Sequence, residues 1–257
     1  MLLIEPIPAF SDNYIWAITS GNRSYVVDPG DPTVVEQYLQ QNNRTLAGIL
    51  ITHHHWDHTD GVAELVEHYQ VDVYGPAQSP FTGITQPLTS GQAVELFGHS
   101  FTVKDVPGHT LDHISYFSQS NEQPILFCGD TLFLAGCGRL FEGTPAQMQQ
   151  AMEYFRKLPE NTAVYCTHEY SLSNLAFAAA VEPESTAIRQ SIQRCEDARK
   201  QNRPTLPTSI GDEKQINPFM RTDQPAVCQA AANYITNTDT SDPAAVLATI
   251  REWKNNF

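Results

Sequence analysis

Seven consecutive residues, T-H-H-H-W-D-H at positions 52–58, place five possible metal ligands side by side directly after a short apolar run. Such a run is typical of a buried strand. A loop leaving a strand can turn His53 and His55 toward one cation and Asp57 and His58 toward a second. Neutral imidazole and carboxylate suit zinc, and also iron or manganese. Neither pair completes a coordination shell, so the fold must bring further ligands from distant sequence.

Three further candidates each follow a predicted strand: His109, Asp130 and His168. Strand ends hold ligands more rigidly than long loops do, and glycine before His109 and Asp130 lets backbone approach closely. A carboxylate such as Asp130 has two oxygens and can bridge two cations. The seven residues therefore predict a site for two divalent metal ions, zinc being our first expectation. The histidines at 54, 68, 99 and 113 are interpreted as structural, with His113 the best placed to support a ligand.

The predicted secondary structure changes along the chain. Up to residue 168, β-rich runs alternate with helical patterns, and after 168 only helical patterns remain. Strands are predicted at 2–8, 13–19, 24–28, 46–52, 71–74, 93–97, 101–106, 114–117, 125–129 and 162–167. Helices are predicted from Pro32, over 61–69, from a capping box at 144–147 to about 158, and over 171–181, 183–202, 224–235 and 242–254. We therefore expect two domains, 1–168 and 169–257.

Charge and composition exclude several classes of function. The net charge is −14, and residues 1–170 hold 19 acidic and 6 basic side chains. Such a surface repels polyanions, so no nucleic-acid partner is expected. We expect no targeting segment, and no apolar run is long enough to span a membrane. Five scattered cysteines without C-x-x-C spacing argue against a disulfide framework. We expect a cytoplasmic monomer without a membrane partner.

Several motifs together resemble a known family. VVDPGD, THHHWDH, PGHT, CGDTLF and THEY closely resemble the metallo-β-lactamase superfamily. AGCGRLFEGT at 135–144, NPFMR at 217–221 and the R-x-x-K spacing at 251–254 resemble glyoxalase II, the hydroxyacylglutathione hydrolases. The resemblance implies a four-layer αββα sandwich of two mixed sheets with a C-terminal all-helical domain that binds glutathione. The implied activity is hydrolysis of S-D-lactoylglutathione to glutathione and D-lactate, the second step of methylglyoxal detoxification.

The resemblance also implies roles for individual residues. The first metal would be held by His53, His55 and His109, the second by Asp57, His58 and His168, and Asp130 would bridge both beside a metal-bridging hydroxide. Asp57 and Asp130 would then be the catalytic carboxylates. Asp28 resembles the family's acid behind the ligands, which fits the need of ligand histidines for an orienting partner.

The implied contacts to glutathione come from Arg139, Phe141, Tyr170, Arg251 and Lys254. Arg251 and Lys254 are three apart and share one helix face. Two positions depart from the family pattern. Phe141 stands where tyrosine is common, which puts one hydroxyl contact in doubt. Asp112 stands where glycine is common, which predicts a changed turn or an extra charge near the ligands.

The chemistry agrees with a thioester substrate. Two cations about 3.5–4 Å apart can lower the pKa of water to about 7, and a thiol with a pKa near 8.5 can leave without a strong general acid. The alternatives are another hydrolase of the superfamily, such as a lactonase or a tRNA 3′-processing nuclease, a mononuclear iron persulfide dioxygenase that recognises glutathione, and a non-catalytic glutathione- or metal-binding protein. The acidic surface and helical tail disfavour the nuclease.

Overall fold

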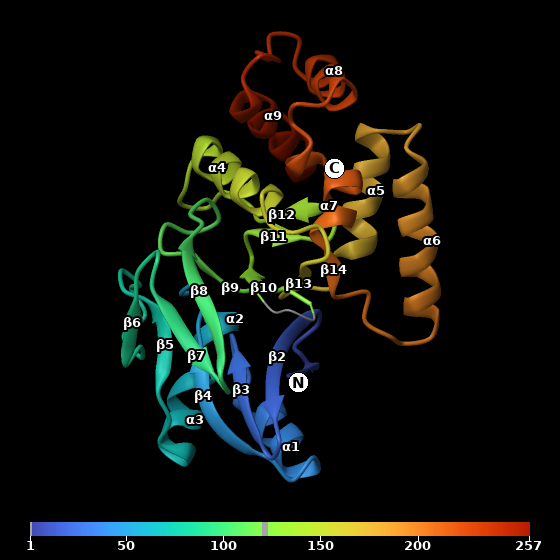
Figure 1. Cartoon of the computed structure of the whole chain (residues 1–257). Coiled ribbons are helices and arrows are strands. Elements are labelled where there is room, and N and C mark those ends of the chain that lie inside the picture. The colour runs from blue at the N-terminus through green and yellow to red at the C-terminus, as the bar shows by residue number, and fades with distance from the viewer. Residues whose placement is uncertain (1, 120–122) are drawn as a thin grey trace. The chain divides into compact units, whose positions relative to one another are not determined.

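The computed structural model describes residues 2–119 and 123–257, and the chain divides into two compact units (Figure 1). Unit 1 comprises Met1–Asp105, Asp112–Gly129 and Tyr165–Glu169, and unit 2 comprises Val106–Leu111, Asp130–Val164 and Tyr170–Phe257. Neither unit is continuous in sequence, unlike the predicted domains 1–168 and 169–257, and that division remains a prediction. Among the described residues, no helix is long and apolar enough to cross a membrane.

The first sheet of unit 1 has six strands in chain order. They are β1 (Leu3–Ala9), β2 (Asn13–Ser20), β3 (Arg23–Val27), β4 (Thr45–Leu50), β5 (Val73–Pro76) and β6 (Gln86–Leu88). The first three pair antiparallel and the next pairs, from β3 to β6, are parallel. The sheet is therefore mixed, as predicted.

Two helices cover one face of this sheet, α1 (Pro32–Gln41) and α3 (Val62–Tyr69). The Asp31 side chain accepts from the Thr33 N–H, and Pro32 at the first helical position has its φ set for a helix. The buried cluster between sheet and helices includes Ile7, Ile15, Val26, Val35, Leu39, Ile49, Leu65 and Val73. Each fully buried aliphatic side chain of this size contributes roughly 1.5–3 kcal/mol, so this core anchors the loops that leave the strands.

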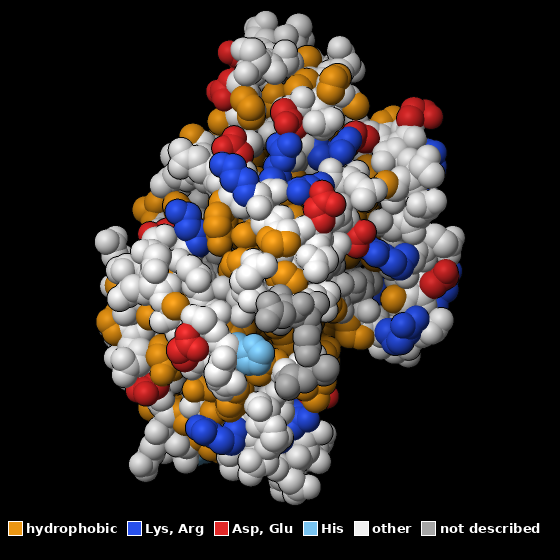
Figure 2. All heavy atoms as spheres, viewed as in Figure 1, with side chains coloured by type: hydrophobic (Ala, Val, Ile, Leu, Met, Phe, Trp, Pro, Cys, Tyr) orange, Lys and Arg blue, Asp and Glu red, His pale blue; other side chains and the backbone are white. Residues whose placement is uncertain are grey.

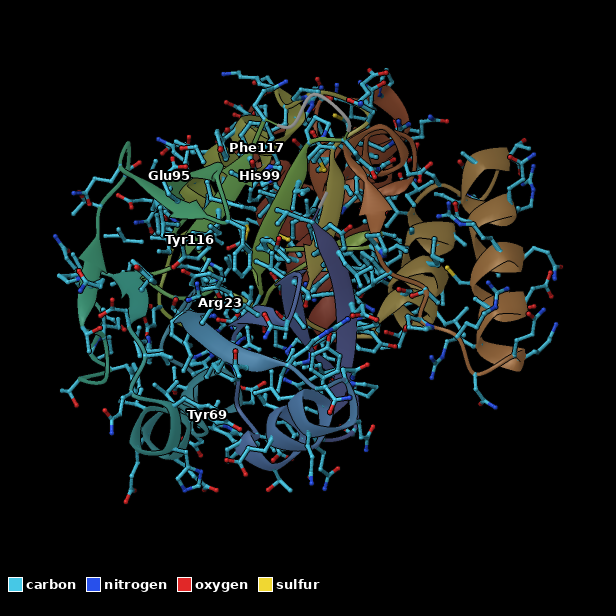
Figure 3. The ribbon with its side chains drawn as sticks, turned by 60° about the horizontal axis from the view of Figure 1, so that its bottom comes forward. Arg23, Tyr69, Glu95, His99, Tyr116 and Phe117 are labelled. Carbon is cyan, nitrogen blue, oxygen red and sulfur yellow. The ribbon has the colours of Figure 1, made fainter. Side chains whose placement is uncertain are left out.

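The second sheet contributes four antiparallel strands to unit 1: β7 (Ala93–Leu96), β8 (His99–Asp105), β9 (Ile114–Ser118) and β10 (Ile125–Gly129). Tyr116 of β9 lies in the interior, whereas Glu95 and His99 lie on the β7–β8 hairpin (Figure 3). The Tyr116 hydroxyl donates to the Ile51 carbonyl over 2.7 Å. Burial raises the pKa of Tyr116 well above its usual value, so the phenol stays neutral and ties the second sheet to the end of β4.

Unit 2 is mainly helical. Its elements are α4 (Pro145–Arg156), α5 (Ser171–Val181), α6 (Thr186–Lys200), α7 (Ile210–Ile216), the 3-10 helix η1 (Pro218–Met220), α8 (Pro225–Tyr234), α9 (Pro243–Asn255) and the short strands β11 (Leu132–Phe133), β12 (Gly136–Cys137) and β14 (Thr208–Ser209). The helices α5 and α6 run side by side (Figure 1). The predicted capping box at Thr144 and Gln147 is present at the start of α4.

Both acidic and basic side chains lie over the region of α6 on the face shown in Figure 2. Lys200 pairs with Glu196 and Asp197 of the same helix, and Arg194 pairs with Asp212 of α7. All of these side chains are well exposed, so each pair contributes little to stability. The balance of charges agrees with the composition of this part of the chain.

Strand β13 (Ala163–Cys166) belongs to both units, because its first two residues lie in unit 2 and its last two in unit 1. It pairs antiparallel with β14. The ten predicted strands and the predicted helices are all present to within a few residues. The elements that were not predicted are short: α2 (Trp56–Thr59), β6, β11, β12, β14, α7 and η1. Too few residues repeat in such elements for a periodic pattern to appear. The described chain has no disulfide.

A buried carboxylate, Glu213 of α7, ties the β11–β12 hairpin to the helices of unit 2. It accepts hydrogen bonds from the Thr208 hydroxyl, the Asn217 amide and the Ala135 N–H. Ala135 has a positive φ of 53°, a conformation that is costly for a residue other than glycine, so this turn needs outside support. Burial raises the pKa of Glu213 to about 7, although these three hydrogen bonds act to lower it.

We predict that Glu213→Gln removes a pH dependence of stability. The folded pKa of about 7 lies above the usual 4.5, so the unfolded chain loses the proton first and stability falls as pH rises through this window. Between pH 4.5 and 7 the free energy of unfolding of the glutamine variant should rise relative to that of the wild type, by up to about 3 kcal/mol. Urea unfolding with chelator at pH 5 and pH 8 measures the difference. The exposed Glu252→Gln is the matched control, and a gap that does not change with pH would contradict the prediction.

Candidate metal centre

Asp57, His58 and His168 form a compact group within unit 1. Each offers a ligand atom within 4.8 Å of the others. The Nε2 atoms of His58 and His168 each lie 3.5 Å from the Asp57 Oδ2 atom, longer than the 2.7–2.9 Å of a charge-assisted hydrogen bond. Both histidines are buried. Two imidazole nitrogens and one carboxylate oxygen that face one another are a donor set that fits a divalent cation.

The backbone around α2 is shaped by close packing with the loop after β3. A Cβ on Gly30 would lie 2.0 Å from the carbonyl oxygen of Asp57, so only glycine fits there. The Gly61 N–H donates to the Pro29 carbonyl over 3.1 Å. Together these contacts fix where the short helix begins and ends, and with it the direction of Asp57 and His58.

His53 and His55 present ring nitrogens to each other in the same unit. The His53 Nε2 and His55 Nδ1 atoms are 3.2 Å apart. The Thr52 hydroxyl donates to Asp28 and lies 3.0 Å from His53 Nδ1. Because that hydroxyl has used its proton, it can only accept from His53, which places the imidazole proton on Nδ1. The Nε2 lone pair of His53 is then directed toward His55 and available to a cation.

Asp28 supports this arrangement from beneath. Its carboxylate accepts from the Thr52 N–H and the Thr52 hydroxyl, both over 2.7 Å. Its Oδ2 atom lies 3.1 Å from His58 Nδ1, and Asp28 itself is only 2% exposed. A buried carboxylate facing Nδ1 favours the tautomer with its proton on Nδ1, which would leave the Nε2 lone pair for a cation. The geometry is that expected for the orienting acid.

Two residues that sequence reasoning missed also contact the group. The Asp12 Oδ1 atom lies 2.7 Å from His168 Nδ1, and the Asn13 amide donates to Asp57 Oδ2 over 3.0 Å. Both stand where the first strand turns into the second. Asn13 was predicted only as the first residue of the strand 13–19, and no role was predicted for Asp12. The neighbouring sequence does not indicate this contact, because the partner of Asp12 lies 156 positions further along the chain.

His109 and Asp130 belong to unit 2. The His109 Nε2 and Asp130 Oδ2 atoms lie 3.6 Å apart, and both residues are buried. His109 Nδ1 lies 2.8 Å from the Arg139 carbonyl oxygen, which accepts the Nδ1 proton and leaves Nε2 as the ligand atom. A Cβ on Gly138 would lie 2.1 Å from the Asp130 carbonyl oxygen, so the loop needs glycine there. That these two residues complete the ligand set with those of unit 1 remains a prediction.

Three of the predicted glutathione contacts lie at the surface of unit 2. Arg139 is exposed, Phe141 is 63% exposed and Tyr170 is 38% exposed. The Phe141 ring lies 5.3 Å from the His109 ring and the Tyr170 ring 5.5 Å from that of Phe133. The Arg139 carbonyl therefore accepts from His109, while its side chain is exposed to solvent.

Arg251 and Lys254 of α9 differ from each other in surroundings. Arg251 is 6% exposed, donates to the Cys137 carbonyl over 2.8 Å and lies over the Phe219 ring, so it has a structural role whether or not it meets substrate. The Lys254 ammonium donates to the Ser173 carbonyl over 3.1 Å. Burial, followed by the positive charges of Arg251 and Arg139, lowers the pKa of Lys254 to about 8. Unit 2 thus gathers three cations within electrostatic reach of one another.

Asp112 makes an additional polar contact beneath the histidine loop. It is 8% exposed, lies 2.9 Å from His54 Nδ1 and accepts from the Ser79 hydroxyl over 2.7 Å. The departure from glycine thus adds a carboxylate that faces His54, a histidine outside the candidate ligand set. His113 stacks on His53 with centroids 4.5 Å apart and planes inclined by 16°, so it supports a candidate ligand through its ring.

Comparison with known proteins identifies the relatives of the chain. Residues 10–168 match the metallo-β-lactamase superfamily and residues 169–257 match the hydroxyacylglutathione hydrolase C-terminus. A hydroxyacylglutathione hydrolase of Vibrio parahaemolyticus is 51% identical over 259 residues, and one of Hahella chejuensis is 49% identical over 258, with 100% of each chain covered. The structure is similar to the crystal structure of ETHE1 from Myxococcus xanthus, with a TM-score of 0.65, 22% identity and 99% and 98% of the two chains covered.

These matches confirm the predicted fold class, a metallo-β-lactamase fold followed by a helical domain. The superfamily match and the histidine and aspartate group of unit 1 together indicate that the chain binds divalent metal ions.

We predict that Asp112→Ala destabilises the chain by about 1–3 kcal/mol, because the Ser79 hydroxyl and the His54 ring would each lose a buried partner. Urea unfolding of chelated protein measures this. Ser79→Ala should lower the free energy of unfolding by less than Asp112→Ala does. The double variant should lose less than the sum of the two single losses, because the two residues share one contact. Additive effects, or wild-type stability of Asp112→Ala, would show that the contact contributes nothing.

Proposed function

The chain belongs to the hydroxyacylglutathione hydrolases of the metallo-β-lactamase superfamily, and we propose S-D-lactoylglutathione as the thioester that it hydrolyses to glutathione and D-lactate. The activity is hydrolysis of an S-(2-hydroxyacyl)glutathione, which follows from full-length relatives about half identical to this chain. The lactoyl group would make the reaction the second step of methylglyoxal detoxification.

One observation carries the proposal: the group of the buried His58 and His168 with the partly buried Asp57, whose ligand atoms lie within 4.8 Å of one another. Each member has its own support, from Asn13, Asp28 and Asp12 respectively. Ligands held in this way need little reorganisation on binding an ion, and the carboxylates beside the two Nδ1 atoms raise the basicity of the imidazoles.

The donor types support two divalent metal ions held by His53, His55, Asp57, His58, His109, Asp130 and His168. Zinc is the metal we propose, because neutral imidazoles and carboxylates are its usual ligands, although iron and manganese accept the same set. When bound, such ions lower the pKa of water toward neutrality and polarise a carbonyl group. Asp57 and Asp130 are the carboxylates we propose for the catalytic centre.

The cations of unit 2 are the proposed binding site for the glutathione part of the substrate. Glutathione carries two carboxylates and one ammonium at neutral pH, and Arg139 and Lys254 offer charges of the opposite sign to the carboxylates. Arg139 is exposed, and its planar guanidinium suits a bidentate contact with a carboxylate. Tyr170 and Phe141 offer exposed ring surface in the same unit. Phe141 lacks the hydroxyl common at this position in the family.

The leaving group explains why a thioester suits this site. A thiol has a pKa near 8.5, so glutathione can depart as the thiolate without a strong general acid. An amide or a phosphodiester has a poorer leaving group and calls for a proton donor. Cytoplasmic location and a monomeric state remain predictions.

We predict that the purified protein releases thiol from S-D-lactoylglutathione and that chelation abolishes the release. Re-addition of zinc should restore it, and metal analysis of the same samples should give two ions per chain. Release of thiol that survives complete removal of metal would overturn the proposal. A protein that carries metal but never releases thiol would instead be a binding protein.

Two variants separate the metal centre from the substrate contacts. Asp130→Asn should lower kcat at least 100-fold, because it weakens the proposed bridging ligand. Arg139→Ala should raise KM by about tenfold with little change in kcat, since it removes a charge pair to the bound substrate while the His109 contact is made by its backbone carbonyl. Comparable losses of kcat in both variants would count against Asp130 as the bridge.

We also predict a pH dependence of substrate binding that originates in Lys254. With a pKa of about 8, the side chain is charged below pH 8 and becomes neutral above it, so KM should rise as pH increases from 7 to 9, by about fivefold at most. Lys254→Arg stays charged throughout this range and should show a flatter profile. An equal rise of KM in both proteins would assign the effect to another group.

A further inference from the structure

The turn that joins β1 to β2 is built into the Asp57–His58–His168 group. Ala9 pairs with Asn13 across the hairpin, which leaves residues 10–12 as a three-residue loop. Phe10 has a positive φ of 48°, and this tightens the turn. We call residues 10–13 the first turn. No motif of the family resemblance includes it.

Backbone hydrogen bonds fasten the first turn and β2 to the segment that carries His168. The Tyr14 N–H donates to the Thr167 carbonyl over 2.6 Å, and the Glu169 N–H donates to the Asp12 carbonyl over 2.8 Å. Between them, Asn13 and His168 form an antiparallel bridge. The His168 backbone is therefore held against the first turn on both sides.

The Asp12 side chain then fixes the His168 ring. Its Oδ1 atom lies 2.7 Å from His168 Nδ1, while its Oδ2 atom accepts from the Ser11 hydroxyl over 2.8 Å. An ionised carboxylate can only accept, so the His168 proton lies on Nδ1. The Nε2 lone pair consequently faces Asp57, whose Oδ2 atom is 3.5 Å away.

Asn13 reaches the second member of the group. Its amide donates over 3.0 Å to Asp57 Oδ2, the same oxygen that lies 3.5 Å from both His58 Nε2 and His168 Nε2. Asn13 is 5% exposed, so this amide is a buried donor with a defined direction. One turn thus supports two of the three ligands, and it does so through two adjacent side chains.

We propose that Asp12 and Asn13 are positioning residues that set how tightly this group holds its metal ion, Asp12 through His168 and Asn13 through Asp57. The inference rests on the metal binding of the proposed function. His53 takes its support from Thr52, which in turn contacts Asp28, and neither belongs to the first turn. Loss of the turn's contacts should therefore loosen one of two bound ions and leave the other.

Competitive zinc titration against a chromophoric chelator, on the full chain, tests this. Asp12→Ala should lower the affinity for one equivalent of zinc by about 10–100-fold, the range for loss of a residue that orients a ligand. The affected equivalent should be the one that His168→Ala no longer binds. Asn13→Ala should weaken the same equivalent, by less. Asp12→Asn should lie between wild type and Asp12→Ala, because the amide oxygen can still accept from Nδ1.

A double variant and a matched control decide whether Asp12 acts through His168. In the His168→Ala background, Asp12→Ala should cause no further loss of zinc. Asp223→Ala removes a carboxylate that lies 3.0 Å from Arg156 Nη2 and belongs to none of the candidate metal groups of the described residues, so it should leave both equivalents unchanged. Wild-type zinc affinity in Asp12→Ala, further loss in the double variant, or equal weakening of both equivalents would overturn the inference.

The same samples distinguish this inference from the proposed function. If the wild type binds zinc and Asp12→Ala weakens the expected equivalent, but no thiol is released from S-D-lactoylglutathione, the proposed substrate is wrong and the inference stands. If the wild type hydrolyses the thioester and Asp12→Ala binds zinc like the wild type, the inference fails alone. The control is urea unfolding of the metal-free proteins. The same unfolding midpoint for Asp12→Ala and the wild type shows that the lower zinc affinity does not come from loss of the fold.

Discussion

The histidine loop depends on one buried carboxylate. Asp28 stands at the end of β3 with a positive φ of 56° and accepts two hydrogen bonds from Thr52 at the end of β4. A carboxylate that is 2% exposed would be costly without such donors. Its remaining contact, to His58 Nδ1, sets the tautomer of a candidate ligand. Two neighbouring strand ends and one ligand are thereby fixed by a single side chain.

The two compact units carry different polar groups. Unit 1 carries four candidate ligands on one short loop and a fifth, His168, on a segment more than a hundred residues later. Unit 2 carries His109 and Asp130 together with the cations proposed for glutathione. Ligands on rigid strand ends suit a metal, whereas exposed arginine and half-buried lysine suit a flexible, anionic substrate.

Sequence reasoning worked best where the signal was local. The long strands and helices appeared at the predicted positions, because each has enough residues for its periodicity to be read. The capping box at Thr144 was readable because its two partners are three residues apart. Short elements such as α2 and β11 were missed for the opposite reason. Spacing predicted that Arg251 shares a helix face with Lys254, and the family resemblance implied its contact with glutathione. The structure adds a buried hydrogen bond to the Cys137 carbonyl that neither could indicate.

The residues alone decided the chemistry: imidazoles and carboxylates in a dense motif can be read as metal ligands wherever the chain places them. Tertiary structure decided which groups support them. Asp12 meets His168 and Asn13 meets Asp57 only because the first hairpin lies against a segment that follows β13. The same holds for Asp112 and His54, and for Glu213 beneath the β11–β12 turn. Hydrogen bonds between residues far apart in sequence leave no periodic trace, since their partners are selected by packing rather than by spacing.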